Sequence, residues 1–266
     1  MAKPRRRRVV RQIRGVRIVA GSRPVGALVE GFLGAVLPVQ CVGCGAWDEV
    51  LCPSCRSLAS SQPLPTTLEG ARGAIPGLVL GEYSGALRRI ILGAKHAART
   101  DVGDFLDEAG ATLGASLWRV VGGAGSPAWV RGLGRGRVRR GGAAAQVWVV
   151  PAPSSWGRRL RGRQVALPLA RGVARGLALG SPPGVRVRVV DAVALRAGAG
   201  SQSGKAGAAR TVGRMGSMRA RVVAPAGALV VAVDDVVTTG ATIREMERVL
   251  GRLDGVAALG RPGLIS

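Results

Sequence analysis

Aromatic side chains are scarce in this chain of 266 residues, since tryptophan, tyrosine and phenylalanine together make up only 3% of it. This scarcity excludes the platform of stacked rings on which many proteins hold single-stranded nucleic acid. Long apolar runs are missing as well, because no window of about 18 residues is uninterruptedly apolar. We therefore expect no transmembrane helix and no stable insertion into a membrane.

Acidic residues are also few, with 15 Asp and Glu against 39 Lys and Arg, and the formal net charge is +24. So large an excess of positive charge favours a polyanionic partner or substrate, such as single-stranded DNA. The alternative is compositional, because the abundant Arg, Ala, Gly and Val are all encoded by GC-rich codons. Apolar residues make up 47% of the chain, which argues against disorder of the whole.

The N-terminal residues imitate a secretion signal without completing one. The basic stretch "MAKPRRRRVVRQIRGVRIVA" precedes the apolar "VGALVEGFLGAVLPVQC", but Glu30 interrupts the apolar part and no small-residue cleavage site follows. We interpret residues 1–25 as a basic, disordered arm and residues 26–37 as a short amphipathic helix. Without a secretion signal, a cytoplasmic location is expected.

All four cysteines lie in "CVGCGAWDEVLCPSC", as two C-x-x-C pairs with a seven-residue spacer. Each pair can turn two sulfurs toward one ion, and two pairs complete the tetrahedral thiolate shell of a closed, structural Zn²⁺ site. An iron–sulfur cluster and disulfides are the alternatives. The predicted module spans residues 26–60, and its zinc ligands are Cys41, Cys44, Cys52 and Cys55.

Beyond the cysteines, segments of strand and helix character alternate. The Ser-, Pro- and Thr-containing stretch 56–76 is typical of a linker, and the Gly/Arg-rich stretch 122–146 indicates an insertion, either a plain surface loop or an RNA-binding one. The alternation predicts an α/β domain over residues 76–266, with a doubly wound parallel sheet. We expect strands at 78–80, 147–150, within 184–195, 229–233 and 255–260, and helices from about 85 and at 102–119, 165–179 and 242–253.

The stretch "VVAVDDVVTTGAT", residues 230–242, carries the chemistry. Its apolar start is typical of a buried parallel strand, and the spacing of the apolar residues that follow it indicates a helix after a tight loop. In parallel sheets such a loop lies at the carboxyl edge, where ligands bind. The helix start and Gly240 favour a phosphate there, whereas Asp234 and Asp235 suit a neighbouring diol or a phosphate-bound Mg²⁺.

A phosphate beside a diol describes a ribose 5-phosphate. The alternative is that the polar residues of this loop only cap the following helix. The predicted ligand-binding residues are Asp234, Asp235, Thr238, Thr239, Gly240, Ala241 and Thr242.

The same stretch resembles the phosphoribosyl pyrophosphate (PRPP) motif of type I phosphoribosyltransferases, in which two acidic residues and a Thr-Thr-Gly loop follow a hydrophobic strand. With the cysteine pairs before it, the chain resembles the ComF family, which is associated with DNA uptake in natural competence. The resemblance runs from about residue 28 to the end. It also includes Pro38, Tyr83, Gly85, Lys95, Val150, Pro151, Pro153, Arg159, Arg161, Gly162, Gln202 and Arg210.

The resemblance implies a type I phosphoribosyltransferase-like fold that binds PRPP together with Mg²⁺, with Asp234 and Asp235 as candidate catalytic residues. Because pyrophosphate leaves as an anion, catalysis would rest on positioning and on neutralising that charge. The candidate pyrophosphate-binding residues are Arg158, Arg159 and Lys95, with a solvent-exposed basic face as the alternative. His96 is the only histidine, and we expect it to be a surface residue and not a base.

Three functions are compatible with these features. They are a transferase acting on PRPP, a non-catalytic sensor of PRPP or a ribose phosphate, and a DNA-uptake adaptor that holds single-stranded DNA or competence proteins. No acceptor base is indicated, because no aromatic-rich segment is present to bind one.

Overall fold

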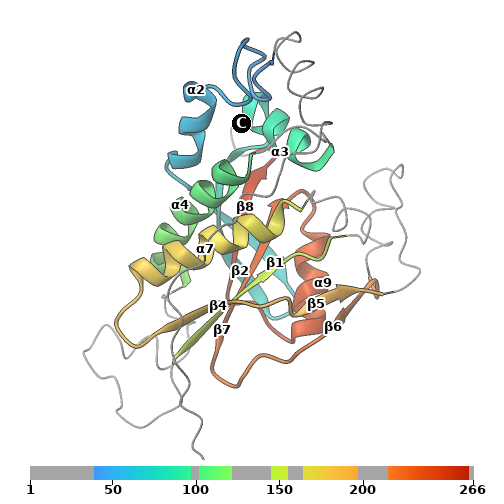
Figure 1. Ribbon diagram of the computed structural model, residues 1–266. Coiled ribbons are helices and arrows are strands. Elements are labelled where there is room, and N and C mark those ends of the chain that lie inside the picture. Colours follow the sequence, from blue (N-terminus) through green and yellow to red (C-terminus); the bar gives the residue numbers. More distant parts are fainter. Residues whose placement is uncertain (1–38, 97–101, 122–144, 155–163, 197–214, 264–266) are drawn as a thin grey trace, which may run out of the picture. The chain divides into compact units, whose positions relative to one another are not determined.

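The computed structural model describes residues 39–96, 102–121, 145–154, 164–196 and 215–263. The predicted basic arm, the helix at 26–37 and nearly all of the insertion lie outside these ranges. The described elements, shown in Figure 1, are α2 (Pro53–Arg56), the 3₁₀ helix η1 (Ser57–Ser60), β1 (Leu64–Gly70), β2 (Gly73–Glu82), α3 (Gly85–His96), α4 (Gly103–Val121), β3 (Gln146–Pro151), α7 (Ala166–Gly180), β4 (Arg186–Val189), β5 (Val193–Leu195), β6 (Met218–Ala220), β7 (Leu229–Val236), α9 (Ala241–Leu250) and β8 (Gly255–Arg261).

A six-stranded, mostly parallel sheet forms the centre of the domain. Its strand order is β1-β2-β8-β7-β3-β4. Only β1 runs antiparallel, to β2, while every other neighbouring pair in this sheet is parallel. The strands β5 and β6 form a separate antiparallel pair. The expected α/β class is therefore confirmed, and the sheet that was predicted to be parallel is parallel except for β1.

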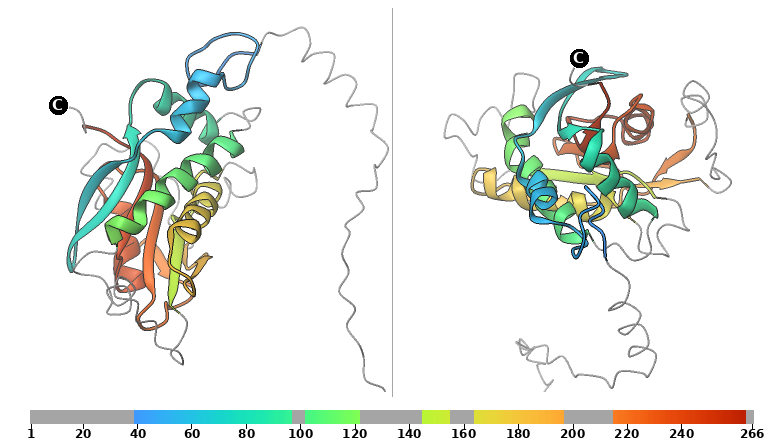
Figure 2. Two further views of the ribbon diagram at one scale, coloured as in Figure 1. Left: turned by 90° about the vertical axis from the view of Figure 1, so that its left-hand side faces the viewer. Right: turned by 90° about the horizontal axis from the view of Figure 1, so that it is seen from above.

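Helices cover both faces of the sheet, as the two views of Figure 2 show. Along β7 the side chains alternate: Val231 and Val233 join the core under α3, α4 and α7, whereas Val230 and Ala232 join the core under α9. Because both sets are fully buried, β7 begins with a continuous apolar run from Leu229 to Val233, which is typical of a central parallel strand.

The helices α4 and α7 pack together through glycines. An added Cβ at Gly110 or Gly114 of α4, or at Gly172 or Gly176 of α7, would lie within 2.3 Å of a backbone carbonyl oxygen of the facing helix. The four glycines recur at a spacing of four residues on each helix, so they line one face of it. The two backbones can therefore approach more closely than side chains would allow.

Most of the predicted elements are present with small shifts of their ends. The strands predicted at 147–150, 229–233 and 255–260 are β3, β7 and β8, and the helices predicted at 102–119 and 165–179 are α4 and α7. The single strand predicted within 184–195 is divided into β4 and β5. Among the helices of the described ranges, none combines the length and apolar character that crossing a membrane requires.

The linker predicted at 56–76 is wrong. This stretch contains the end of α2, η1, β1 and the start of β2, and β1 buries Thr66 and Leu68 against the sheet. The prolines of this stretch indicated a linker, because proline is rare inside paired strands. Here Pro65 lies in β1, an edge strand with one neighbour, and Pro76 precedes the part of β2 that pairs with β8 from Gly77 onward.

Candidate functional sites

The carboxylate pair lies at the carboxyl end of the central strand β7. Asp234 is 8% exposed, and its Oδ1 accepts a hydrogen bond from the backbone N–H of Asp235 at 2.8 Å. The neighbouring strand β3 ends beside it, since Pro151 pairs with Val233 and the N–H of Ala152 donates to the carbonyl of Val233 at 2.7 Å. The pair thus lies at the edge of the sheet where ligands of parallel α/β folds bind.

Lys95 reaches this pair from α3. Its Nζ lies 2.8 Å from Oδ2 of Asp235, and the two side chains are only 17% and 21% exposed. Helix α3 starts near the end of β8, because the N–H of Tyr83, two residues before the helix, donates to the carbonyl of Arg261 at 3.0 Å. Helix α3 therefore extends along this edge from the end of β2 to the end of β7.

A tight loop connects the carboxylates to α9. The N–H of Val237 donates to the carbonyl of Gly260 at 2.9 Å, which fixes the start of the loop to β8. Thr238 and Thr239 are exposed, and Oγ1 of Thr239 accepts from the N–H of Ala241 at 3.4 Å. The two exposed threonines thus lie just before the start of α9, in an arrangement suited to an anion.

Gly240 ends the loop as the N-cap residue of α9. Its φ of 72° and ψ of 5° are left-handed, a conformation that favours glycine. A Cβ added there would lie 3.2 Å from Nη1 of Arg244 and 3.6 Å from Leu68 of β1. The glycine thus has two neighbours that the sequence analysis missed: a cation in the first turn of α9 and a strand that had been interpreted as a linker.

The structure describes most of the predicted ligand-binding residues, but not all of them. Asp234 and Asp235, Thr238 to Thr242 and Lys95 converge on one edge of the sheet, and His96 is exposed at the end of α3. The predicted pyrophosphate residues Arg158 and Arg159 lie outside the described residues. Arg244 was missed, although its position four residues after Gly240 places it on the same side of α9 as the loop.

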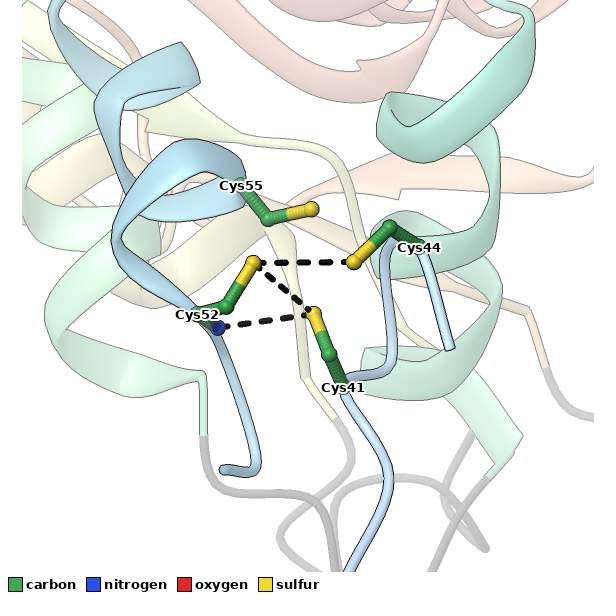
Figure 3. Close-up of side chains that lie close together, drawn as sticks. All are labelled: Cys41, Cys44, Cys52 and Cys55. Atoms are coloured by element: carbon green, nitrogen blue, oxygen red, sulfur yellow. Dashed lines mark hydrogen bonds between the residues drawn. The ribbon is translucent and has the colours of Figure 1, made fainter. Parts of the chain in front are cut away.

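The four cysteine sulfurs point toward a common centre (Figure 3). The Sγ of Cys52 lies 3.6 Å from the Sγ atoms of Cys41 and Cys44, and all four sulfurs lie within 4.8 Å of one another. A tetrahedral ion with metal–sulfur bonds of about 2.3 Å requires sulfurs about 3.8 Å apart. A disulfide would need about 2.05 Å, and all four cysteines are free. The four thiols are placed to bind a zinc ion.

Backbone amides add to this site. Burial raises the pKa of the Cys41 thiol, but backbone N–H groups of Cys44, Cys52 and Gly43 act in the opposite direction and prevail, so that the pKa falls to about 6. Burial, in contrast, raises the pKa of Cys55 far above its ordinary value. Cys41 is thus prepared as a thiolate, the form that binds a metal.

The cysteine site is joined to the main domain. Cys41, Leu51 and Cys55 belong to the same apolar core as the residues of α3 and α4. Nε of Arg89 in α3 donates a hydrogen bond to the carbonyl oxygen of Gly43. Helix α3 therefore contacts the cysteine knuckle through Arg89 and the carboxylate pair through Lys95.

Compared with known proteins, the chain matches no family model and no curated protein.

Proposed function

We propose that this chain is a ComF-like protein with a type I phosphoribosyltransferase-like fold, which binds PRPP or a ribose 5-phosphate at the end of β7. One observation carries the proposal. A carboxylate pair, an exposed Thr-Thr pair, a left-handed glycine and the start of α9 lie within nine residues at the carboxyl edge of a parallel sheet. A ribose 5-phosphate carries both groups that these residues would bind, a diol and an anion.

Each part of the ligand has a matching group. The 5-phosphate binds the loop 238–242, where the positive end of the helix dipole and the side chain of Arg244 offset its charge. The ribose hydroxyls donate hydrogen bonds to the carboxylates of Asp234 and Asp235. A helix cap alone would need only one oxygen acceptor, and Oγ1 of Thr239 already accepts from the N–H of Ala241, so capping does not account for the two carboxylates.

We further propose that the cysteine site holds one structural Zn²⁺. Four thiolates leave no open coordination position, so the metal stabilises the fold and takes no part in ligand chemistry. Its place in the shared core makes it a support for α3, and through α3 for the ligand site.

The binding proposal is tested by calorimetry with ribose 5-phosphate, using inorganic phosphate as the control ligand. A charge-assisted hydrogen bond contributes about 1.5–3 kcal/mol, so Asp234→Asn or Asp235→Asn should weaken ribose 5-phosphate binding by about ten- to a hundredfold. Inorganic phosphate should bind as before or more tightly, because a repelling charge is removed.

Asp107→Asn is the matched control, since Asp107 also pairs with a basic residue, Arg175, but on the helical layer. It should leave both affinities unchanged. Equal losses for both ligands in the Asp234 and Asp235 variants would mean that the carboxylates only hold the loop in shape. Release of pyrophosphate on mixing with PRPP and candidate bases would separate a transferase from a sensor.

A further inference from the structure

The resemblance to PRPP-binding enzymes implies Mg²⁺ at the carboxylate pair, but the side chains around the pair do not favour it. Mg²⁺ requires oxygen ligands at about 2.0–2.1 Å in nearly octahedral geometry. One oxygen of Asp234 already accepts the N–H of Asp235, and Oδ2 of Asp235 is in contact with the ammonium group of Lys95 at 2.8 Å. A dication bound to the same carboxylate would lie within a few ångströms of that ammonium and be repelled by it.

We propose that Lys95 is the resident counter-ion of this carboxylate pair and takes the place of a divalent cation there. One consequence of this proposal is that ribose 5-phosphate binds without Mg²⁺, and only this consequence rests on the proposed function. An ammonium group has three N–H donors, so Lys95 can hold Asp235 with one and donate to a ligand oxygen with another.

The position of Lys95 is built into the fold. Leu87, Ile90 and Ile91 bury one face of α3 in the main core, and Arg89 on the same helix binds the carbonyl of Gly43. Lys95 lies in the last turn, where the negative end of the helix dipole favours a cation. With four-fifths of both side chains shielded from water, the pair is screened less by solvent than a surface ion pair would be.

The first test needs no sugar. Mn²⁺, a substitute for Mg²⁺, is titrated into the zinc-loaded full chain and followed by electron paramagnetic resonance. The wild type should show no Mn²⁺ site at the pair, whereas Lys95→Met should gain one of at least about tenfold higher affinity, because a like charge about 4 Å away is removed. The double variant Lys95→Met with Asp235→Asn should lose that site again.

Two further variants control this test. Lys95→Arg keeps the cation and should bind Mn²⁺ no better than the wild type. Arg119→Met removes a positive charge from the exposed last turn of α4 and should also change nothing. If the wild type binds Mn²⁺ at Asp235 as tightly as Lys95→Met does, or if Lys95→Met gains no site, Lys95 is not the counter-ion and the proposal is overturned.

Calorimetry with ribose 5-phosphate, with and without added Mg²⁺, then tests the consequence. The wild type should bind equally in both buffers, whereas Lys95→Met should bind more weakly without Mg²⁺ and regain affinity when Mg²⁺ is added. A wild type that binds only with Mg²⁺ contradicts the proposal. If the wild type does not bind the sugar in either buffer while the Mn²⁺ results are as expected, the ribose-phosphate function fails and the assignment of Lys95 stands.

Discussion

Gly43 lies at the tightest point of the cysteine site, and replacing it with alanine should damage the metal centre selectively. A Cβ at this position would lie 2.5 Å from the Sγ of Cys55, 3.0 Å from its Cβ and 3.3 Å from Cδ1 of Ile90. The new methyl group would therefore meet both the side chain of a metal ligand and the core residue of α3 that supports it.

The size of the effect follows from these distances. Non-bonded heavy atoms need about 3.5 Å or more, so Cys55 has to move by about 1 Å, several times the roughly 0.2 Å tolerance of metal–ligand bonds. Rotation of the Cys55 side chain alone cannot remove the clash, because the Cβ of Cys55 also lies close to the new methyl group. Mutation of residues that orient a metal ligand typically costs about ten- to a hundredfold in metal affinity, and we expect a loss of that order for Gly43→Ala.

Metal analysis of the chain purified without added metal should first find about one zinc per chain. The zinc affinity of the wild type and of each variant is then measured by competition with a chromogenic chelator. Gly45→Ala is the matched control: its φ of 83° makes a side chain cost about 1–2 kcal/mol in stability, but nothing lies within 4 Å of the new Cβ. It should keep the affinity that Gly43→Ala loses. Equal affinities of the wild type and Gly43→Ala, or the presence of iron instead of zinc, would refute the reasoning.

Two further predictions concern stability. Gly176→Ala should lower the free energy of unfolding, measured in urea, by about 1–3 kcal/mol or more, because its Cβ would lie 2.1 Å from the carbonyl oxygen of Ala111. The control Gly180→Ala, whose Cβ would lie 3.5 Å from its nearest neighbour, should not lower it. Equal losses for the two variants would contradict the close packing of α4 and α7. The hydrogen bond from Arg248 lowers the pKa of Glu245 below its ordinary 4.5, so this carboxylate stabilises the fold above pH 4.5 and the stabilisation is lost as pH falls through the lowered pKa. Glu245→Gln should therefore have a lower free energy of unfolding than the wild type at pH 7, and the difference between the two proteins should become smaller below pH 4.5. A difference that does not change with pH would contradict this prediction.

The elements around β7 could be predicted because their local pattern has one interpretation. A run of small and β-branched apolar residues suits a strand with two buried faces, and the glycine after it matches a left-handed helix start. The same holds for the cysteines, whose spacing alone indicates convergence on one ion, and whose sulfurs do converge.

The hairpin of β1 and β2 could not be predicted in the same way, because its stability is not local. Its turn is held by the carboxylate of Glu247, to which the N–H of Ala71 donates at 2.7 Å, although the two residues are 176 positions apart. Arg261, at the end of β8, donates to the carbonyl of Thr67 at 3.0 Å. A stretch rich in Pro, Ser and Thr becomes a strand here because α9 and β8 supply its partners.

The charge of the ligand site has the same long-range origin. From the sequence alone, Asp234 and Asp235 are two adjacent carboxylates suited to a neighbouring diol or to a phosphate-bound Mg²⁺. Folded, they are adjacent to Lys95, which precedes them by about 140 residues and is held by a helix that also supports the cysteine knuckle. Arg89 and Lys95 are six residues apart on α3, or about 9 Å along its axis. Helix α3 thus contacts the cysteine site through Arg89 and the carboxylate pair through Lys95. The charge at this edge of the sheet therefore depends on the packing of α3 as well as on residues 230–242.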